Sequence, residues 1–226
     1  MRLPPLTPEE RDRVTAAVTA AEVDTDAEIV TIIAQRSDSY HDVALHYALA
    51  AMLLLMAAAA LYPAIVEVPI GWFGNGWTSA ATLGSAIFAL MVAQAIVFLV
   101  VRYALAWPML RMMLTPGTTQ ARRVRRRAVQ YFRVGAERRT AARIGVLVYL
   151  SLDERLAEIV ADQAIHAKVV PERWGAAMAA LVDHLRAGRA GEGMAAAVTA
   201  IGAIVATHFP KTDSDVNELP DRLIEL

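Results

Sequence analysis

Two long apolar segments interrupt a chain whose other hydrophobic runs are short. Residues 43–61 and 80–101 contain no acidic, lysine or arginine side chain. A helix needs about 20 apolar residues to cross the hydrocarbon core of a bilayer. We therefore expect two transmembrane helices, joined by a short connection whose aromatic residues suit the headgroup zone. This divides the chain into three parts: residues 1–42, a transmembrane hairpin at 43–107 and residues 108–226.

The pattern before the apolar segments predicts one helix and one strand. Thr7-Pro8-Glu9-Glu10 places an N-cap, a proline at the first helical position and a capping-box glutamate in order. Residues 28–35 are apolar and β-branched, which is typical of a strand. One helix and one strand cannot form a stable core alone. They must be completed by elements that follow the apolar segments.

The pattern after the apolar segments predicts further helices and strands. Residues 144–150 form a continuous apolar run, typical of a strand buried on both faces. Gly188 and Gly191 should separate the last two helices, and the tail from His208 should be a loop. The elements expected here are a helix at about 121–139, strands at 144–150 and 156–161, a helix from Pro171 and a helix at 194–205. This order predicts a small α/β/α sandwich in which residues 28–35 lie beside residues 144–150.

Composition and charge support a membrane location. Hydrophobic residues make up 56% of the 226 residues and charged residues 20%, against about 45–50% and about 25% in soluble domains. The net charge of −1 hides a segregation, because residues 108–144 hold ten arginines and one glutamate. Positive residues that flank spans stay in the cytoplasm. We therefore expect a multi-pass protein of the bacterial inner (cytoplasmic) membrane with both termini in the cytoplasm.

The arginine cluster favours a partner with negative charge. Anionic lipid headgroups attract basic segments beside a span, at about 1 kcal/mol per residue. Nucleic acid is the alternative, but no stacking motif accompanies the arginines, so we expect no nucleic acid to bind. The residues expected at the membrane surface are Arg122, Arg123, Arg125, Arg126 and Arg127.

Candidate chemistry is limited to a few carboxylates and one histidine. The chain has no cysteine, which excludes disulfides, zinc ribbons and cysteine nucleophiles. Asp153, Glu154 and Asp162 follow predicted strands, and their oxygens would suit Ca²⁺ or Mg²⁺. His166 lies four residues after Asp162, so a helical turn would place both on one face, where the histidine could act as a general base. The simpler interpretation is a solvated turn with surface ion pairs and an ordinary surface histidine.

Several motifs, taken in order, resemble one known family. They are Ala21-Glu22-Val23-Asp24-Thr25-Asp26-Ala27-Glu28-Ile29, Glu137-Arg138-Arg139-Thr140, Gly145-Val146-Leu147-Val148-Tyr149-Leu150-Ser151, Glu154-Arg155, Trp174, His208-Phe209-Pro210 and Asn217-Glu218-Leu219-Pro220-Asp221. This set is similar to the TPM domain family, named for thylakoid and photosystem II repair proteins and a modulator of levan synthesis. The similarity is to its bacterial membrane-bound members.

The resemblance implies a Rossmann-like α/β/α sandwich and an acid phosphatase or calcium-binding activity, as reported for some plant members. The chain departs from the family where members carry Gly-x-Gly-Leu, because residues 161–165 contain no glycine. We therefore expect a non-catalytic binding or assembly module whose partner is another membrane protein. A weak metal-dependent phosphatase using Asp153, Glu154 and Asp162 is the alternative. A transporter subunit is a third hypothesis, and it would require the apolar helices to form a homo-oligomer.

Overall fold

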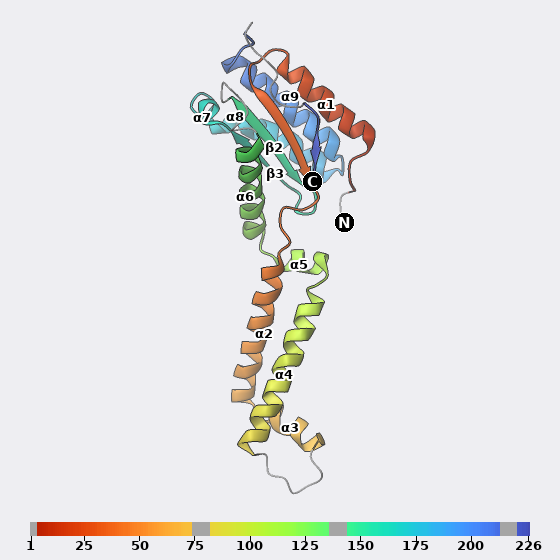
Figure 1. Ribbon diagram of the computed structural model, residues 1–226, viewed down its shortest axis with the longest axis vertical. Helices are drawn as coiled ribbons and strands as arrows, with labels where there is room; N and C mark the ends of the chain where they lie inside the picture. The colour runs from red at the N-terminus through yellow and green to blue at the C-terminus, as the bar shows by residue number, and fades with distance from the viewer. Residues whose placement is uncertain (1–3, 74–81, 136–143, 213–220) are drawn as a thin grey trace. The chain divides into compact units, whose positions relative to one another are not determined.

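The structure, a computed structural model, describes residues 4–73, 82–135, 144–212 and 221–226. The chain forms two compact units (Figure 1). The first, called the body, combines Met1–Asp38 with Gly117–Leu226, and the second, called the helical unit, is Ser39–Pro116. The body is therefore built from two stretches of sequence that the helical unit separates.

The body contains a four-stranded mixed sheet. Its strands are β1 (Glu28–Ala34), β2 (Gly145–Ser151), β3 (Leu156–Ala161) and β4 (Ile224–Glu225), in the order β3-β2-β1-β4. β1 and β2 are parallel, with the register running from Glu28 opposite Gly145 to Ala34 opposite Ser151. β3 returns antiparallel to β2. The prediction that residues 28–35 and 144–150 lie side by side is confirmed.

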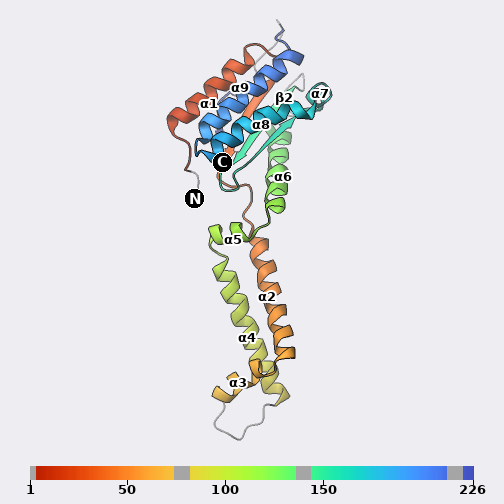
Figure 2. The same cartoon turned by 180° about the vertical axis from the view of Figure 1, so that it is seen from behind.

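Helices cover both faces of this sheet. Ile29, Val146 and Val148 are buried in one core cluster with residues of α1 (Pro8–Glu22), α8 (Pro171–Arg186) and α9 (Ala190–His208). The alternate strand residues, such as Leu147 and Tyr149, are buried against α6 (Gly117–Gly135) on the other face. Figure 2 shows α1, α8 and α9 together on one side of the strands. The body is an α/β/α sandwich, as the order of elements predicted.

The helical unit contains two long apolar helices that pack against each other. They are α2 (His41–Leu61) and α4 (Leu83–Ala104). The Gln94 amide of α4 donates a hydrogen bond of 3.0 Å to the Met52 carbonyl of α2. Two short helices complete the described part of the unit: α3 (Ala64–Phe73) and α5 (Pro108–Leu114).

Three described helices are long and apolar enough to cross a membrane, namely α2, α4 and α9. They differ in how much of their apolar surface is buried by protein. Of the most apolar 18-residue stretch of each helix, 17% is buried in α2, none in α4 and 56% in α9. α9 packs between α1 and α8 in the body, so it is a core helix. The apolar side chains of α4, and most of those of α2, are not buried within this chain.

Several element boundaries differ from those expected. α3, α5 and the short strand β4 were not predicted, and α6 starts at Gly117 rather than near residue 121. Gly188 ends its helix with a positive φ of 77°, as expected. Gly191, however, lies inside the first turn of α9, where an added Cβ would come within 2.6 Å of the Glu10 side chain. This glycine permits close packing of α9 on α1 rather than a break.

The local sequence explains why α1 starts where it does. The Thr7 hydroxyl accepts a hydrogen bond from the Glu10 amide, and the Glu10 carboxylate accepts one from the Thr7 amide. The predicted capping box is therefore confirmed.

Two of the motifs quoted for the family resemblance, residues 137–140 and residues 217–220, lie outside the described residues.

Candidate functional site

Asp153 and Glu154 lie where the parallel strands β1 and β2 end. The Asp153 carboxylate accepts hydrogen bonds from the side-chain amide of Gln35 at 2.7 Å and from the Arg36 guanidinium at 2.8 and 3.0 Å. The buried Glu154 carboxylate accepts one from the Ser37 amide at 3.0 Å and a further one from the Ser151 hydroxyl. Both carboxylates therefore tie the residues after β1 to the turn after β2.

Tyr149 extends this polar network into the core. Its hydroxyl lies 3.0 Å from the Ser37 hydroxyl, and both side chains are buried. Burial raises the pKa of Tyr149 above its ordinary value. The phenol therefore stays protonated at neutral pH and can donate a hydrogen bond.

Asp162 and His166 lie at the opposite end of the sheet. Asp162 occupies the N-cap position of α7 (Gln163–His166) without a side-chain capping bond, and its carboxylate instead accepts a hydrogen bond of 2.8 Å from the backbone amide of Gly145 at the start of β2. The predicted helical turn between Asp162 and His166 exists, because the His166 amide bonds to the Asp162 carbonyl at 3.0 Å. β3 carries the chain away from Glu154, so the structure does not bring the three carboxylates together.

The donor set does not fit a Ca²⁺ or Mg²⁺ site formed by these residues. A divalent cation needs several oxygen ligands around one point, whereas Asp153 and Glu154 lie at one end of the sheet and Asp162 lies at the other. Asp153 also contacts the positive charge of Arg36 at 2.8 Å. In the described part of the chain, no group of three or more histidine or acidic side chains is placed to hold a metal ion. No chemical step through a metal follows from these residues.

Residues 161–165, where the family resemblance would place Gly-x-Gly-Leu, contain no backbone conformation that requires glycine. Asp162 has φ −64° and ψ 157°. Among the described non-glycine residues, only Tyr40 and Arg155 have a positive φ. The backbone at 161–165 therefore adopts a conformation open to any residue, and it does not need glycine.

The five predicted surface arginines divide into two groups along α6. Val124 and Ala128 are fully buried against the sheet. Arg123 forms an ion pair of 3.2 Å with Asp38, and Arg127 donates a hydrogen bond of 3.0 Å to the Ser37 carbonyl. These two arginines fix α6 to the residues that follow β1, so they contribute to the body's own structure.

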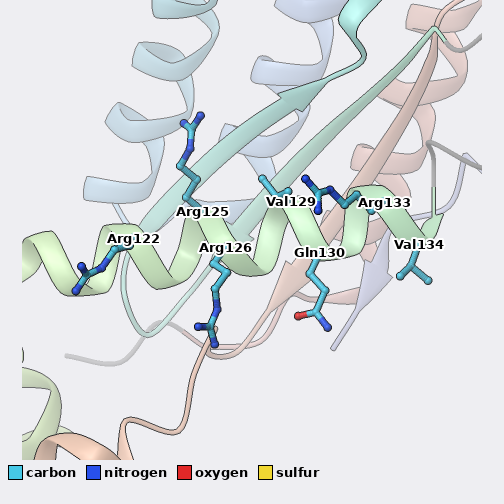
Figure 3. A pocket seen from close by; sticks show the side chains of 7 residues that line it. All are labelled: Arg122, Arg125, Arg126, Val129, Gln130, Arg133 and Val134. Carbon is cyan, nitrogen blue, oxygen red and sulfur yellow. The ribbon is translucent and has the colours of Figure 1, made fainter.

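The other group surrounds a hollow of about 820 Å³ along the outer surface of α6. The side chains that line it are Arg122, Arg125, Arg126, Val129, Gln130, Arg133 and Val134. In Figure 3, Arg125 extends over the strands, whereas Arg126 and Gln130 extend to the other side of the helix. Arg125 lies 3.6 Å from the Glu158 carboxylate of β3. Arg122, Arg126 and Arg133 are exposed, and they have no ion-pair partner within the described ranges.

A second hollow lies on the other face of β3, between this strand and α8. It encloses about 280 Å³ and is lined by Glu158, Ile159, Ala161, His166, Trp174, Gly175 and Met178. The Trp174 indole N–H is buried and has no hydrogen-bond partner among the described residues. Burial raises the pKa of Glu158, and the nearby Arg125 partly offsets this effect. His166, predicted as a general base, lines this hollow rather than the sheet end that holds Asp153.

Glu22 is a titratable group that the sequence patterns did not single out. Its carboxylate accepts a hydrogen bond of 2.7 Å from the Ile29 amide. The pKa of Glu22 is raised from 4.5 to about 8, chiefly by burial; the charges of Glu28 and Asp221 also raise it, whereas the Ile29 amide and Lys211 lower it. A glutamate followed closely by Asp24, Asp26 and Glu28 in the sequence was the available signal, but its burial depends on the tertiary fold.

The raised pKa of Glu22 makes the stability of the body depend on pH. A folded-state pKa of about 8 lies above the ordinary 4.5, so the folded state binds the extra proton, and stability is lost as the pH rises from about 4.5 through about 8. Glu22→Gln keeps a hydrogen-bond acceptor without the charge. We expect it to match the natural protein at about pH 5 and to be more stable at about pH 9.

Urea unfolding of both proteins at the two pH values measures this difference. Glu9→Gln is the matched control, because Glu9 is exposed in the first turn of the same helix. If Glu22→Gln and the natural protein differ by the same amount at both pH values, Glu22 does not titrate in this range.

The fold and the polar groups define a class: a small α/β/α domain with a mixed sheet, interrupted after its first strand by an apolar helical unit. A family model, described as the TPM domain, matches residues 110–204. Residues 110–204 are therefore similar to a TPM domain. The match starts in α5 and leaves out α1 and β1. In sequence, the helical unit lies between these two elements and the rest of the body that they complete.

One solved structure has a similar fold. It is the NMR structure of the BA42 protein from the psychrophilic bacterium Bizionia argentinensis, with a TM-score of 0.55 and 17% sequence identity. The similarity covers 98% of this chain and 95% of that one. No curated protein matches the chain. At this identity the comparison establishes the fold and carries no activity.

Proposed function

We propose that the chain is a membrane-anchored binding module of the bacterial inner membrane, with α2 and α4 as its two spans and both termini in the cytoplasm. The single observation that carries this proposal is the unburied surface of α4. Ile87, Phe88 and Ile96 are each at least 55% exposed, and none of the helix's most apolar window is buried by protein. Lipid would cover such a surface, whereas water would not.

The charge distribution supports the cytoplasmic placement of the body. Arg102 lies in the last turn of α4, at the end of the second span, and Arg111 follows the span in α5. Arg122 and Arg126 are exposed on the next helix. Positive residues within about 15–20 residues of a span stay on the cytoplasmic side. In this proposal Arg122 and Arg126 contact anionic lipid headgroups, at about 1 kcal/mol each, and Arg123 and Arg127 stabilise the body.

The same proposal assigns the body a binding role without catalysis. Asp153, Glu154 and Asp162 each accept hydrogen bonds from the protein itself. Such bonds position backbone segments, and they occupy the oxygens that a phosphatase would use to hold a cation. Another membrane protein is the expected partner, because the anchor confines the body to the membrane surface.

Hydrolysis of an aryl phosphate separates the binding role from the phosphatase alternative. We expect the purified full-length protein in detergent to show no turnover above buffer, with or without Ca²⁺ or Mg²⁺. Asp162→Asn serves as the matched variant, because it keeps the side chain's shape and an acceptor for the Gly145 amide. Cation-dependent turnover that disappears in Asp162→Asn would establish the phosphatase instead.

A further inference from the structure

β3 leaves one edge of the sheet open. The sheet order places it outermost, and among the described residues it pairs with β2 alone. The Asp162 amide bonds to the Gly145 carbonyl at 3.0 Å. Backbone groups of an antiparallel strand face its partner at alternate residues, so those of Ala157, Ile159 and Ala161 face away from β2. An exposed strand edge of this kind can accept a further strand.

The two sides of this edge offer different chemistry. On the α8 side, the hollow beside Ile159 is lined by Trp174 and Met178, and the Trp174 indole N–H lacks an acceptor among the described residues. On the α6 side, Arg125 reaches Glu158 at 3.6 Å. Residues four and eight positions further along α6, Val129 and Arg133, continue this flank of the helix.

The charge of the α6 side selects the partner. Arg125 and Arg133 line the hollow on this flank of α6, and Glu158 of β3 lies 3.6 Å from Arg125. The opposite flank of α6 uses Arg123 and Arg127 to bind the residues after β1. The positive charge beside the open edge is therefore left for an external group. A second copy of this edge would bring like charges together.

We propose that the open edge of β3 binds an extended acidic segment of a partner protein as an added strand. Successive side chains of a strand point to opposite faces. Acidic residues of the segment would face the α6 arginines, and the alternate apolar residues would enter the hollow beside Trp174 and Met178. This inference deepens the proposed binding role and rests on it. The partner that it names is a membrane protein that carries such a segment.

A synthetic peptide of about eight residues that alternates glutamate and valine is the probe. The protein is the full chain in neutral-lipid nanodiscs, with Trp72, Trp77 and Trp107 replaced by phenylalanine so that Trp174 is the one tryptophan of the four that remains. We expect the peptide to change Trp174 fluorescence saturably and to bind more weakly as salt rises towards about 0.5 M. A peptide that alternates lysine and valine should bind at least about tenfold more weakly.

Two variants and one modified peptide test the charge and the strand pairing separately. Arg125→Glu with Arg133→Glu should reverse the preference, so that the lysine peptide binds more tightly. The matched double reversal, Arg13→Glu with Arg186→Glu, changes exposed arginines on α1 and α8, and it should leave the preference unchanged. The glutamate peptide with four consecutive N-methylated amides should lose at least about tenfold in affinity, because it cannot pair with a strand edge.

Each remaining result contradicts the proposal. Equal binding of the N-methylated peptide would show attraction without strand pairing. Absence of binding by either peptide would remove the site. If Trp174 responds to anionic nanodisc lipid and not to the peptide, the edge binds lipid instead. Membrane anchoring is measured separately by alkaline extraction. Failed peptide binding in a chain that stays in the membrane therefore defeats this inference and leaves the anchor intact.

Discussion

Replacing Ile201 by alanine will lower the free energy of unfolding of the body by about 2–5 kcal/mol. Ile201 lies in the middle of α9 and is fully buried in the core cluster that α9 shares with α1, α8 and the sheet. The smaller side chain leaves a cavity that close-packed neighbours cannot fill. The neighbouring Gly202 shows how close the packing is, because a Cβ there would lie 2.6 Å from the Ala21 Cβ.

The measurement is a urea titration of the full chain in detergent, followed by Trp174 fluorescence with the other tryptophans replaced. Ile96→Ala in α4 is the matched control, because it removes the same atoms from a side chain that is 55% exposed. We expect this control to leave the urea midpoint of the body unchanged. If Ile96→Ala also shifts the midpoint, α4 is not the unburied helix; if Ile201→Ala does not shift it, α9 is not the core helix.

Ile96→Arg will remove most of the protein from the membrane fraction. A charged side chain near the centre of a span costs about 2.5–3.5 kcal/mol of insertion free energy, and two spans of a single hairpin offer no further helix to shelter it. Ile96 lies near the middle of α4, more than one helical turn before Arg102, and its side chain is exposed.

Resistance of the protein to alkaline carbonate extraction measures this effect. Arg186→Ala, on the exposed side of α8, controls for a change of charged residue that leaves α4 intact. We expect the control to stay with the membrane. An Ile96→Arg protein that resists extraction as well as the control does would show that α4 lies outside the hydrocarbon core.

The arrangement of strands could be predicted from the sequence, but the grouping of side chains could be predicted only in part. Residues 28–34 and 145–151 are mostly apolar, so each required cover on both faces, and a shared sheet provides it. The separation of Glu154 from Asp162 also followed from the predicted elements. A turn and a six-residue strand carry the chain about 20 Å to the opposite end of the sheet. The hypothesis that grouped Glu154 and Asp162 into one candidate site did not take this distance into account.

Other features depend on tertiary contacts that no local pattern contains. Arg123 and Arg127 are four residues apart and share a helix flank, but only the position of Asp38 and Ser37 shows that this flank faces protein. Glu22 has a raised pKa because α1 and the start of β1 bury it. β4 is two residues long and pairs with β1, so its sequence carried too short a pattern to predict a strand.

The side of the membrane on which each unit lies is the most direct test of the account. The natural chain has no cysteine, so Gly76→Cys, in the connection between the two apolar helices, and Arg186→Cys, in the body, each provide a unique thiol. A membrane-impermeant maleimide applied to intact spheroplasts should label Gly76→Cys and should label Arg186→Cys only after lysis. Labelling of Arg186→Cys before lysis, or protection of Gly76→Cys, would contradict a cytoplasmic body held by a two-helix anchor.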